Sequence, residues 1–394
     1  IMSIKRYIST KDNSITNAFD TSNVTRATTA NMGGSHVLES FSIYGQASTS
    51  SLEKKRVLVE FPVNTISTDR DQYTIPESGS VRFILKLLNA EHAETLPRSF
   101  TMCVSPALQA WEEGIGLDME TYADTGGSCW ISSSLGSLWN SEGATIPVQS
   151  RMASNRIPIE YKQDFDSGLE DLEIDITPFV EEKLVSHKAG ATKASGSVQL
   201  ATTPAVGKTV TLYATEGDFR TVTISTSSAT SGKIIYVERG GNTIATVANL
   251  ATSINADSLF SAGVNSGNNQ KVDIGQASKG FYGNTIISSS IEDATIVNFA
   301  NALGISNYGY VVRLSGSFED GTRERSYYTK RFFARTSQYF FKRPNIEARW
   351  DRSKQDDRGF VSISSSLSPL EDNQNTIFLY NRSRGSLVDI PDTG

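Results

Sequence analysis

A run of carboxylates in the first third of the chain has the composition of a cation site. The run reads WEEGIGLDMETYAD and begins at residue 111. Its acidic residues are Glu112, Glu113, Asp118, Glu120 and Asp124. Carboxylates at irregular loop spacing can supply oxygen ligands to Ca²⁺, because Ca²⁺ tolerates loose coordination geometry. The spacing is not that of an EF-hand, so solvated loop charge is the alternative interpretation.

Trp111 opens the same run and is one of four tryptophans, with Trp130, Trp139 and Trp350. Exposed indole rings beside carboxylates could form a platform for sugar rings, so Trp111 and the acidic residues after it are also candidates for glycan binding. Tryptophans buried with their indole N–H satisfied are the more common arrangement in a β protein. We therefore expect these four rings to belong to the core.

The sequence contains no recognisable catalytic or cofactor motif. His36, His92 and His187 are far apart in the chain, and no HExxH spacing occurs. Cys103 and Cys129 do not form a CxxC pair, and no glycine-rich phosphate-binding motif follows a strand pattern. Such motifs mark many zinc, redox and nucleotide sites. We therefore expect neither enzyme activity nor a cofactor.

A second segment, Arg325–Trp350, combines cations with aromatic rings. Its 26 residues include seven Lys or Arg, eight aromatic residues and one acidic residue, Glu347. Single-stranded nucleic-acid binders use cations for phosphates and rings for bases. The net charge of the chain is −6, whereas nucleic-acid binders usually carry a basic balance. Nucleic-acid binding is therefore the least favoured interpretation of this segment.

The aromatic residues of this segment occur in adjacent pairs, such as Tyr327–Tyr328 and Phe332–Phe333. Successive side chains of a strand point to opposite faces, so each pair places one ring in the core and one outside. Outward rings beside Lys and Arg are typical of protein–protein contacts. The residues expected at a subunit contact are Tyr328, Lys330, Arg331, Phe333, Arg335, Phe341, Lys342 and Arg343. A solvated sheet face is the alternative.

The composition favours a globular, mainly β protein. The 394 residues are 38% hydrophobic and 20% charged, which is ordinary for a globular chain. Ser, Thr, Gly and Asn are abundant and long helix-forming runs are absent, which favours sheets joined by turns. Two isolated cysteines indicate folding in a reducing cytoplasm. No apolar run approaches the length of a transmembrane helix, so we expect no membrane span.

The hydrophobic pattern predicts strands and helices that would position these segments. The predicted strands include 55–63, 80–90 and 99–108. The first of them alternates as a half-buried strand, and Cys103 in the third is expected to be a small buried hydrophobe. Thr177 and Thr243 are suitable N-caps for two short amphipathic helices.

The composition changes between Gly190 and Gly304, where only seven basic and seven acidic residues occur. This change predicts a small α+β domain inserted into a larger β domain. The predicted parts are an extended N-terminal arm (1–50), a discontinuous β-sandwich (51–190 and 305–360), the insert (191–304) and a C-terminal strand or tail (361–394).

Short motifs outside the insert resemble the DNRLRE-type β-sandwich, a jelly-roll-like module. The matching pieces are EKKRVLVEFPVNTI, SVRFILKLLNA, QAWEEG, SLWNSEG, LEIDITPFVEEKL and FFARTSQYFFKRPNIEARW. The usual Ser-Arg-Glu near the closing proline is replaced here, and another domain interrupts the module. This resemblance implies a jelly-roll-like sandwich related to some carbohydrate-binding modules.

The insert resembles a small domain found inside bacteriophage virion proteins, chiefly through TIATVANLATSINA at residues 243–256. This resemblance implies a structural protein of a tailed phage, such as a cyanophage, made in the host cytoplasm and located in the virion. We expect it to bind other virion proteins, as a homo-oligomer or symmetric array. The alternative is a glycan-binding module for attachment to the host surface.

Overall fold

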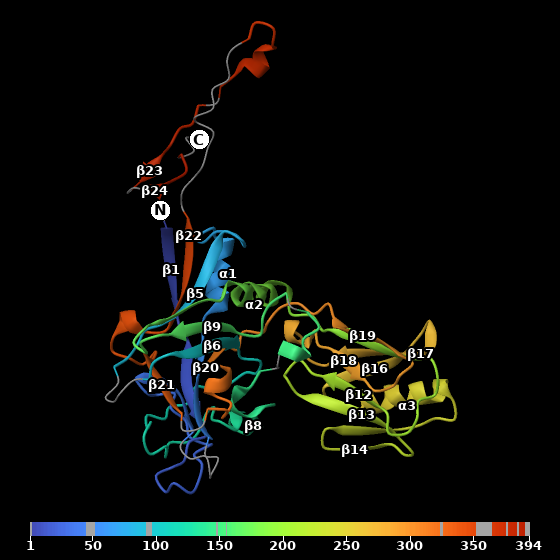
Figure 1. The fold of residues 1–394 in the computed structure, drawn as a ribbon. Helices are drawn as coiled ribbons and strands as arrows, with labels where there is room; N and C mark the ends of the chain where they lie inside the picture. Colours follow the sequence, from blue (N-terminus) through green and yellow to red (C-terminus); the bar gives the residue numbers. More distant parts are fainter. Residues whose placement is uncertain are drawn as a thin grey trace. The chain divides into compact units, whose positions relative to one another are not determined.

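The computed structural model is mainly β, with 39% of residues in strands and 14% in helices (Figure 1). It contains several antiparallel sheets, one of which forms a half-barrel. The structure describes residues 2–44, 52–91, 97–146, 149–154, 156–323, 326–351, 365–375, 377–383 and 386–390. The predicted mainly β class is confirmed, whereas a jelly roll is not shown.

The chain divides into two units. One unit is Ile4–Trp350, and the other joins Ile1–Ser3 to Asp351–Gly394. In the second unit the structure describes a short 3₁₀ helix and a hairpin: η6 (Leu370–Asn373), β23 (Arg382–Ser383) and β24 (Ser386–Leu387). The predicted domain limits stay predictions, and residues 45–50 and 352–360 within them lie outside the described part of the chain.

The largest sheet has seven strands, paired antiparallel in the order β21-β3-β4-β20-β6-β9, with β2 also on β4. The strands are β2 (Lys11–Thr16), β3 (Val37–Tyr44), β4 (Leu52–Glu60), β6 (Phe100–Pro106), β9 (Tyr161–Phe165), β20 (Tyr310–Leu314) and β21 (Tyr327–Phe333). Strand β20 follows the predicted insert yet lies between β4 and β6. The chain therefore returns to the middle of the same sheet, and the N-terminal segment contributes β2 and β3 to it.

A four-stranded sheet has the order β1-β22-β5-β10. Its strands are β1 (Met2–Ile8), β22 (Asn345–Asp351), β5 (Val81–Leu87) and β10 (Leu172–Asp175). Helices α1 (Val63–Asp71) and α2 (Thr177–Ala189) pack on one another (Figure 1). The two guanidinium nitrogens of Arg70 contact the Glu181 carboxylate at 2.7 Å each, which ties α1 to α2. The sequence did not predict α1, because Val63 and Ile66 are its only buried apolar side chains.

Strand β4 is buried on both faces, so its predicted half-buried character is wrong. Val57 and Val59 belong to the main core. Leu58 belongs to a second cluster on the opposite face, with Trp111, Trp130 and Trp139. Strands β7 (Ser132–Ser134) and β8 (Ser137–Leu138) form a small hairpin near this second cluster. Alternation could not reveal this burial, because the loops that cover β4 come from distant sequence.

Residues 194–302 contain a hydrophobic core of their own. Two sheets surround it, in the orders β16-β17-β11-β19 and β14-β15-β13-β12-β18. The strands are β11 (Ser195–Leu200), β12 (Thr209–Tyr213), β13 (Phe219–Ser225), β14 (Ala229–Ser231), β15 (Ile234–Glu238), β16 (Phe260–Asn265), β17 (Asn268–Gln276), β18 (Ile287–Ser289) and β19 (Ala294–Ala300). Helix α3 (Thr243–Asn255) contacts both sheets. Its N-cap is Asn242, whose side chain accepts the Ala245 N–H at 2.8 Å, and not the predicted Thr243.

The segment 191–304 also packs directly on the rest of its unit. Phe281 and Tyr282 belong to the main core. Met152 forms an isolated β-bridge with Thr285, and Ala153 N–H donates to Asn284 O at 2.8 Å. The insert is therefore held by buried rings and backbone hydrogen bonds in addition to its two linkers.

Candidate subunit-contact site

The loop between β21 and β22 exposes three consecutive aromatic rings. A short 3₁₀ helix, η5 (Phe340–Lys342), forms the loop. Tyr339 is 51% exposed, Phe340 53% and Phe341 82%. Aromatic side chains this exposed are unusual in adjacent positions of a monomeric protein, and a contiguous apolar patch marks an interaction site.

The exposed rings are ordered by neighbouring cations. Lys342 Nζ lies 4.6 Å from the ring centre of Phe333 and 4.9 Å from that of Tyr339. The Arg343 guanidinium lies 5.4 Å from the Phe340 ring. Phe341 packs edge-on against Phe340, with ring centres 5.6 Å apart. We call Phe333, Tyr339, Phe340, Phe341, Lys342 and Arg343 the basic–aromatic patch.

The structure corrects the predicted outward orientation of Lys330. Lys330 lies on the same face of β21 as Phe332, which belongs to the core, because alternate residues of a strand share a face. Its ammonium group is buried and donates to Asn89 Oδ1 at 2.6 Å and to Gly168 O at 2.8 Å. Burial lowers the pKa of Lys330 to about 8. Lys330 is therefore buried with two hydrogen-bond acceptors, and its side chain offers no surface to another subunit.

The other predicted contact residues divide between structural and exposed roles. Tyr328 is half-buried and packs edge-on against Phe318, with ring centres 5.0 Å apart. Arg331 Nε contacts Glu39 Oε1 at 2.7 Å across the sheet. Arg335 contacts Glu113 Oε2 at 2.7 Å. Phe341, Lys342 and Arg343 lie in the exposed loop, together with Tyr339 and Phe340, which the sequence interpretation missed.

The acidic run does not converge on a common point. Its contacts are Glu113 with Arg335, Glu112 Oε2 with Leu135 N–H at 3.3 Å, Asp124 Oδ2 with Leu117 N–H at 2.7 Å, and Asp118 Oδ1 with Glu120 N–H at 2.8 Å. Within the described ranges no three His, Cys, Asp or Glu side chains are grouped so as to hold a metal ion. These carboxylates instead fix the conformation of the loop.

The four tryptophans are buried, as expected from the core interpretation. Trp111, Trp130 and Trp139 are at most 7% exposed, and Trp350 is 9% exposed. The indole N–H of Trp111 donates to Tyr308 O at 2.7 Å, and that of Trp139 donates to Cys129 O at 2.8 Å. Cys103 is also buried, as predicted. The four tryptophans therefore do not form an exposed platform for sugar rings.

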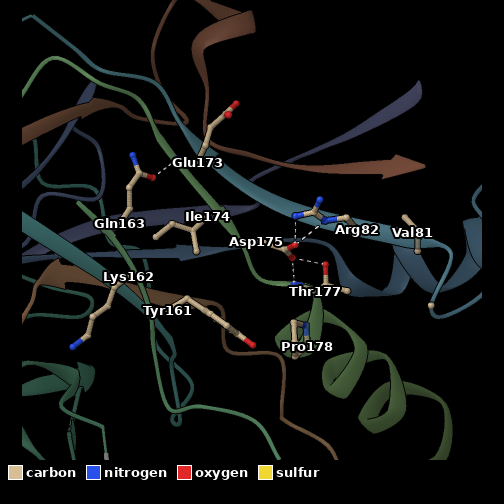
Figure 2. Close-up of a pocket in the computed structure, with 11 residues that line it drawn as sticks. Val81, Arg82, Tyr161, Lys162, Gln163, Glu173, Ile174, Asp175, Thr177 and Pro178 are labelled. Atoms are coloured by element: carbon tan, nitrogen blue, oxygen red, sulfur yellow. Dashed lines mark hydrogen bonds and ion pairs between the residues drawn. The ribbon is translucent and has the colours of Figure 1, made fainter. Parts of the chain in front are cut away.

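An open groove of about 580 Å³ lies where the edge strands β9 and β10 approach one another (Figure 2). Its lining comes from β9 (Tyr161, Lys162, Gln163), β10 (Glu173, Ile174, Asp175), the start of β5 (Val81, Arg82), Gly79, and the start of α2 (Thr177, Pro178). The Gln163 side chain accepts Glu173 N–H at 2.7 Å and donates to Asp171 O at 2.8 Å. This glutamine therefore bridges the two edges.

Most polar groups of the groove already have partners. Figure 2 shows Arg82 facing Asp175, with Arg82 Nη2 2.8 Å from Asp175 Oδ2. Thr177 donates to Asp175 at 2.6 Å and accepts Phe83 N–H at 2.8 Å. Thr177 is the first residue of α2 and does not cap it, because its hydroxyl is used in these two bonds. Lys162 Nζ also contacts Glu160 Oε1 at 3.1 Å. The groove therefore offers a ligand mainly the Tyr161 ring and the apolar side chains of Val81, Ile174 and Pro178.

Asp12, next to the contact segment, is a buried carboxylate with one oxygen that makes no hydrogen bond. Its other oxygen accepts the Arg335 backbone N–H. Burial, with a smaller contribution from Glu113, raises the pKa of Asp12 to about 7. The folded protein therefore retains a proton between about pH 4 and 7 that the unfolded chain has released. Folding stability should fall as the pH rises through this window.

Replacing Asp12 with asparagine should remove this pH dependence. The variant should be about 2 kcal/mol more stable than the natural chain at pH 8 and nearly equal to it at pH 4, since the neutral amide needs no desolvation of charge. Urea unfolding at pH 4, 6 and 8 measures the difference. Asp273→Asn, on the half-exposed face of β17, is the matched control. Parallel stability profiles for Asp12→Asn and the natural chain would contradict the prediction.

Two further points concern the three histidines and the expected absence of a membrane span. His36 Nδ1 lies 3.0 Å from Thr336 O, His187 lies in the last turn of α2, and His92 lies outside the described residues. None of the helices in the described ranges is long and apolar enough to cross a membrane.

No family model matches this sequence, and no curated protein matches it at a significant level. The resemblances noted in the sequence therefore remain expectations.

Proposed function

We propose that this chain is a non-enzymatic structural protein of a phage virion that binds neighbouring virion subunits. The observation that carries the proposal is the basic–aromatic patch, in which Phe341 is 82% exposed beside Lys342 and Arg343. Aromatic residues and arginine contribute most of the binding energy in protein–protein contacts. The placement in a virion depends on the phage-like insert sequence and includes capsid decoration, neck, collar and tail positions.

The framework behind the patch suits this role. Strands β21 and β22 belong to different sheets, and both contribute to the main core. A loop held at both ends by core strands keeps a fixed position, which favours repeated identical contacts. We propose that the two sheets outside the insert correspond to a jelly-roll-like sandwich, with the insert as a second contact module.

Removing the two outermost rings should weaken subunit association. The double variant Phe340→Ser, Phe341→Ser should associate about tenfold or more weakly, because exposed aromatic anchors dominate such contacts. Sedimentation velocity over a concentration series measures the change. Tyr73→Ser is the control, since Tyr73 is 83% exposed but lies outside the patch. Equal loss of association in both variants would argue against a specific contact.

Glycan binding is the alternative function, and the groove in Figure 2 is the observation that favours it. Tyr161 offers a ring there, with Lys162 and Gln163 beside it. A stable monomer that binds a glycan array, and loses binding in Tyr161→Ala, would overturn the structural proposal. A particle reconstruction that places the chain in a symmetric shell or tail ring would support it.

A further inference from the structure

A second exposed apolar surface lies on the acidic side of the molecule. Ile115, Leu117, Leu135 and Leu138 are between 66% and 88% exposed. The first two belong to the acidic run and the last two to the β7–β8 hairpin. Glu112 joins the two segments, because its N–H donates to Ser133 O at 2.9 Å and its carboxylate accepts the Leu135 N–H. We call these four residues the aliphatic patch.

The backbone beneath the aliphatic patch is fixed. Asn31 Nδ2 donates to Glu113 O at 2.9 Å, and Asn31 Oδ1 accepts Gly116 N–H at 3.1 Å. A Cβ on Gly116 would lie 1.9 Å from Asn31 O, so the loop packs closely against residue 31. Ile115 and Leu117 are therefore exposed from an ordered loop, as the rings of the basic–aromatic patch are.

The two patches carry opposite charge. Residues 99–150 contain six acidic residues and no Lys or Arg, whereas residues 325–343 contain six Lys or Arg and no acidic residue. Within one chain the two segments already meet through the contact of Arg335 with Glu113 at 2.7 Å. This ion pair joins the segment that carries the aliphatic patch to the segment that carries the basic–aromatic patch.

We propose that a second copy of this chain covers both patches, with the basic–aromatic patch of each copy docked on the aliphatic patch of the other. This inference rests on the proposed function and names the partner of the same site. Two complementary half-surfaces on one chain are matched by a two-fold rotation, the symmetry of most homodimers. In this contact the aromatic rings of one copy pack on the aliphatic side chains of the other and exclude water. The opposite charges fix the relative position of the two copies and disfavour contact between patches of like charge.

Charge reversal on each side tests the pairing. Lys342→Glu with Arg343→Glu should make both contacts of the dimer repulsive, and Glu120→Lys should weaken them from the other side. Glu112 is kept because its carboxylate holds the β7–β8 hairpin. Each variant alone should dissociate about tenfold or more readily. A 1:1 mixture of the two should recover the association, because each reversed patch then faces a reversed partner. Sedimentation velocity of each variant, and of the mixture with one partner labelled, gives these results.

The apolar half of the contact is tested in the same assay. Ile115→Ser with Leu135→Ser should weaken association without changing charge, and Leu169→Ser is the control because Leu169 is 60% exposed elsewhere. Unfolding curves confirm that each variant folds.

The outcomes separate this inference from the proposed function. Unchanged association in the charge variants, or a mixture that fails to recover, would overturn the two-fold pairing while leaving subunit binding intact. A natural chain that stays monomeric at all concentrations would overturn it as well, and a particle reconstruction would still decide the proposed function.

Discussion

Replacing Glu319 with glutamine should lower the free energy of unfolding by about 3 kcal/mol or more, since it leaves a buried charge uncompensated. Glu319 is 4% exposed. Its carboxylate contacts Arg56 Nε at 2.7 Å and Arg313 Nη1 at 3.0 Å. The glutamine side chain keeps the shape but removes the charge that compensates the buried Arg56, whereas the partly exposed Arg313 keeps its contact with Glu160 Oε2 at 2.7 Å. Arg56 also lies 5.0 Å from the Trp130 ring, so the defect would extend into the second hydrophobic cluster.

The dependence of folding stability on pH should also change at acidic pH in the Glu319→Gln variant. Burial alone would raise the pKa of Glu319, but the charges of Arg56 and Arg313 outweigh it and lower the pKa. The natural chain therefore loses this stabilisation as the pH falls through the depressed value, whereas the variant lacks it at every pH. Guanidinium unfolding at pH 7, and at a series of lower pH values that extends well below the ordinary carboxyl pKa, measures both effects.

The matched control is Glu292→Gln. Glu292 contacts Lys208 at 2.9 Å, but its side chain is 86% exposed. Exposed ion pairs contribute little to stability, so no measurable change is expected. Similar unfolding midpoints for Glu319→Gln and Glu292→Gln would refute the importance of the buried network.

Replacing Gly309 with alanine should disturb the pairing of β20 with its neighbours at the centre of the large sheet. Gly309 has φ +80°, and a Cβ there would lie 2.2 Å from Val59 O, a backbone atom of β4. The oxygen of Gly309 also accepts Ala107 N–H at 3.0 Å and Lys183 Nζ at 3.2 Å. The added atom must therefore displace the start of β20 from both neighbouring strands. The free energy of unfolding should fall by about 3 kcal/mol or more.

Gly79→Ala isolates the contribution of backbone conformation. Gly79 has a similar φ of +88°, but a Cβ there meets no atom within 4 Å. The free energy of unfolding of Gly79→Ala should fall by about 1 kcal/mol, which reflects the left-handed backbone conformation alone. Thermal unfolding followed by circular dichroism compares the two variants, and absence of folded Gly309→Ala protein would agree with the larger loss. Equal losses would show that β20 can move away from β4.

The candidate site could be predicted in part. Phe341, Lys342 and Arg343 were expected at a contact surface from composition, and the structure exposes the loop that contains them. Tyr339 and Phe340 are missed because pairs of adjacent rings are expected to divide between the two faces of a strand, whereas these residues lie in a loop that contains the 3₁₀ helix η5. The outward orientation expected for Lys330 is wrong, because alternate residues of a strand share a face and Lys330 therefore points to the core side of β21 with Phe332.

The aliphatic patch had no distinctive signal in the sequence. Ile115, Leu117, Leu135 and Leu138 are ordinary apolar residues, and their types would equally suit a core. The hydrogen bonds of Asn31 and Glu112 join segments far apart in the chain, and together with the Asp124–Leu117 bond they fix the backbone that carries these side chains. The acidic composition of the segment was visible, but its association with exposed aliphatic side chains was not.

Local sequence patterns were enough to predict the mainly β class, the strands β4, β5 and β6, the helices α2 and α3, and the concentration of cations and rings between residues 325 and 350. These features follow from local periodicity and composition, which act over a few residues. The three-dimensional fold was needed to show which face of a strand is covered and that Lys55, Lys330 and Glu319 are buried with partners. It also shows that the acidic and basic segments meet at Glu113 and Arg335. Burial and charge pairing depend on contacts between residues far apart in the chain, which no local pattern specifies.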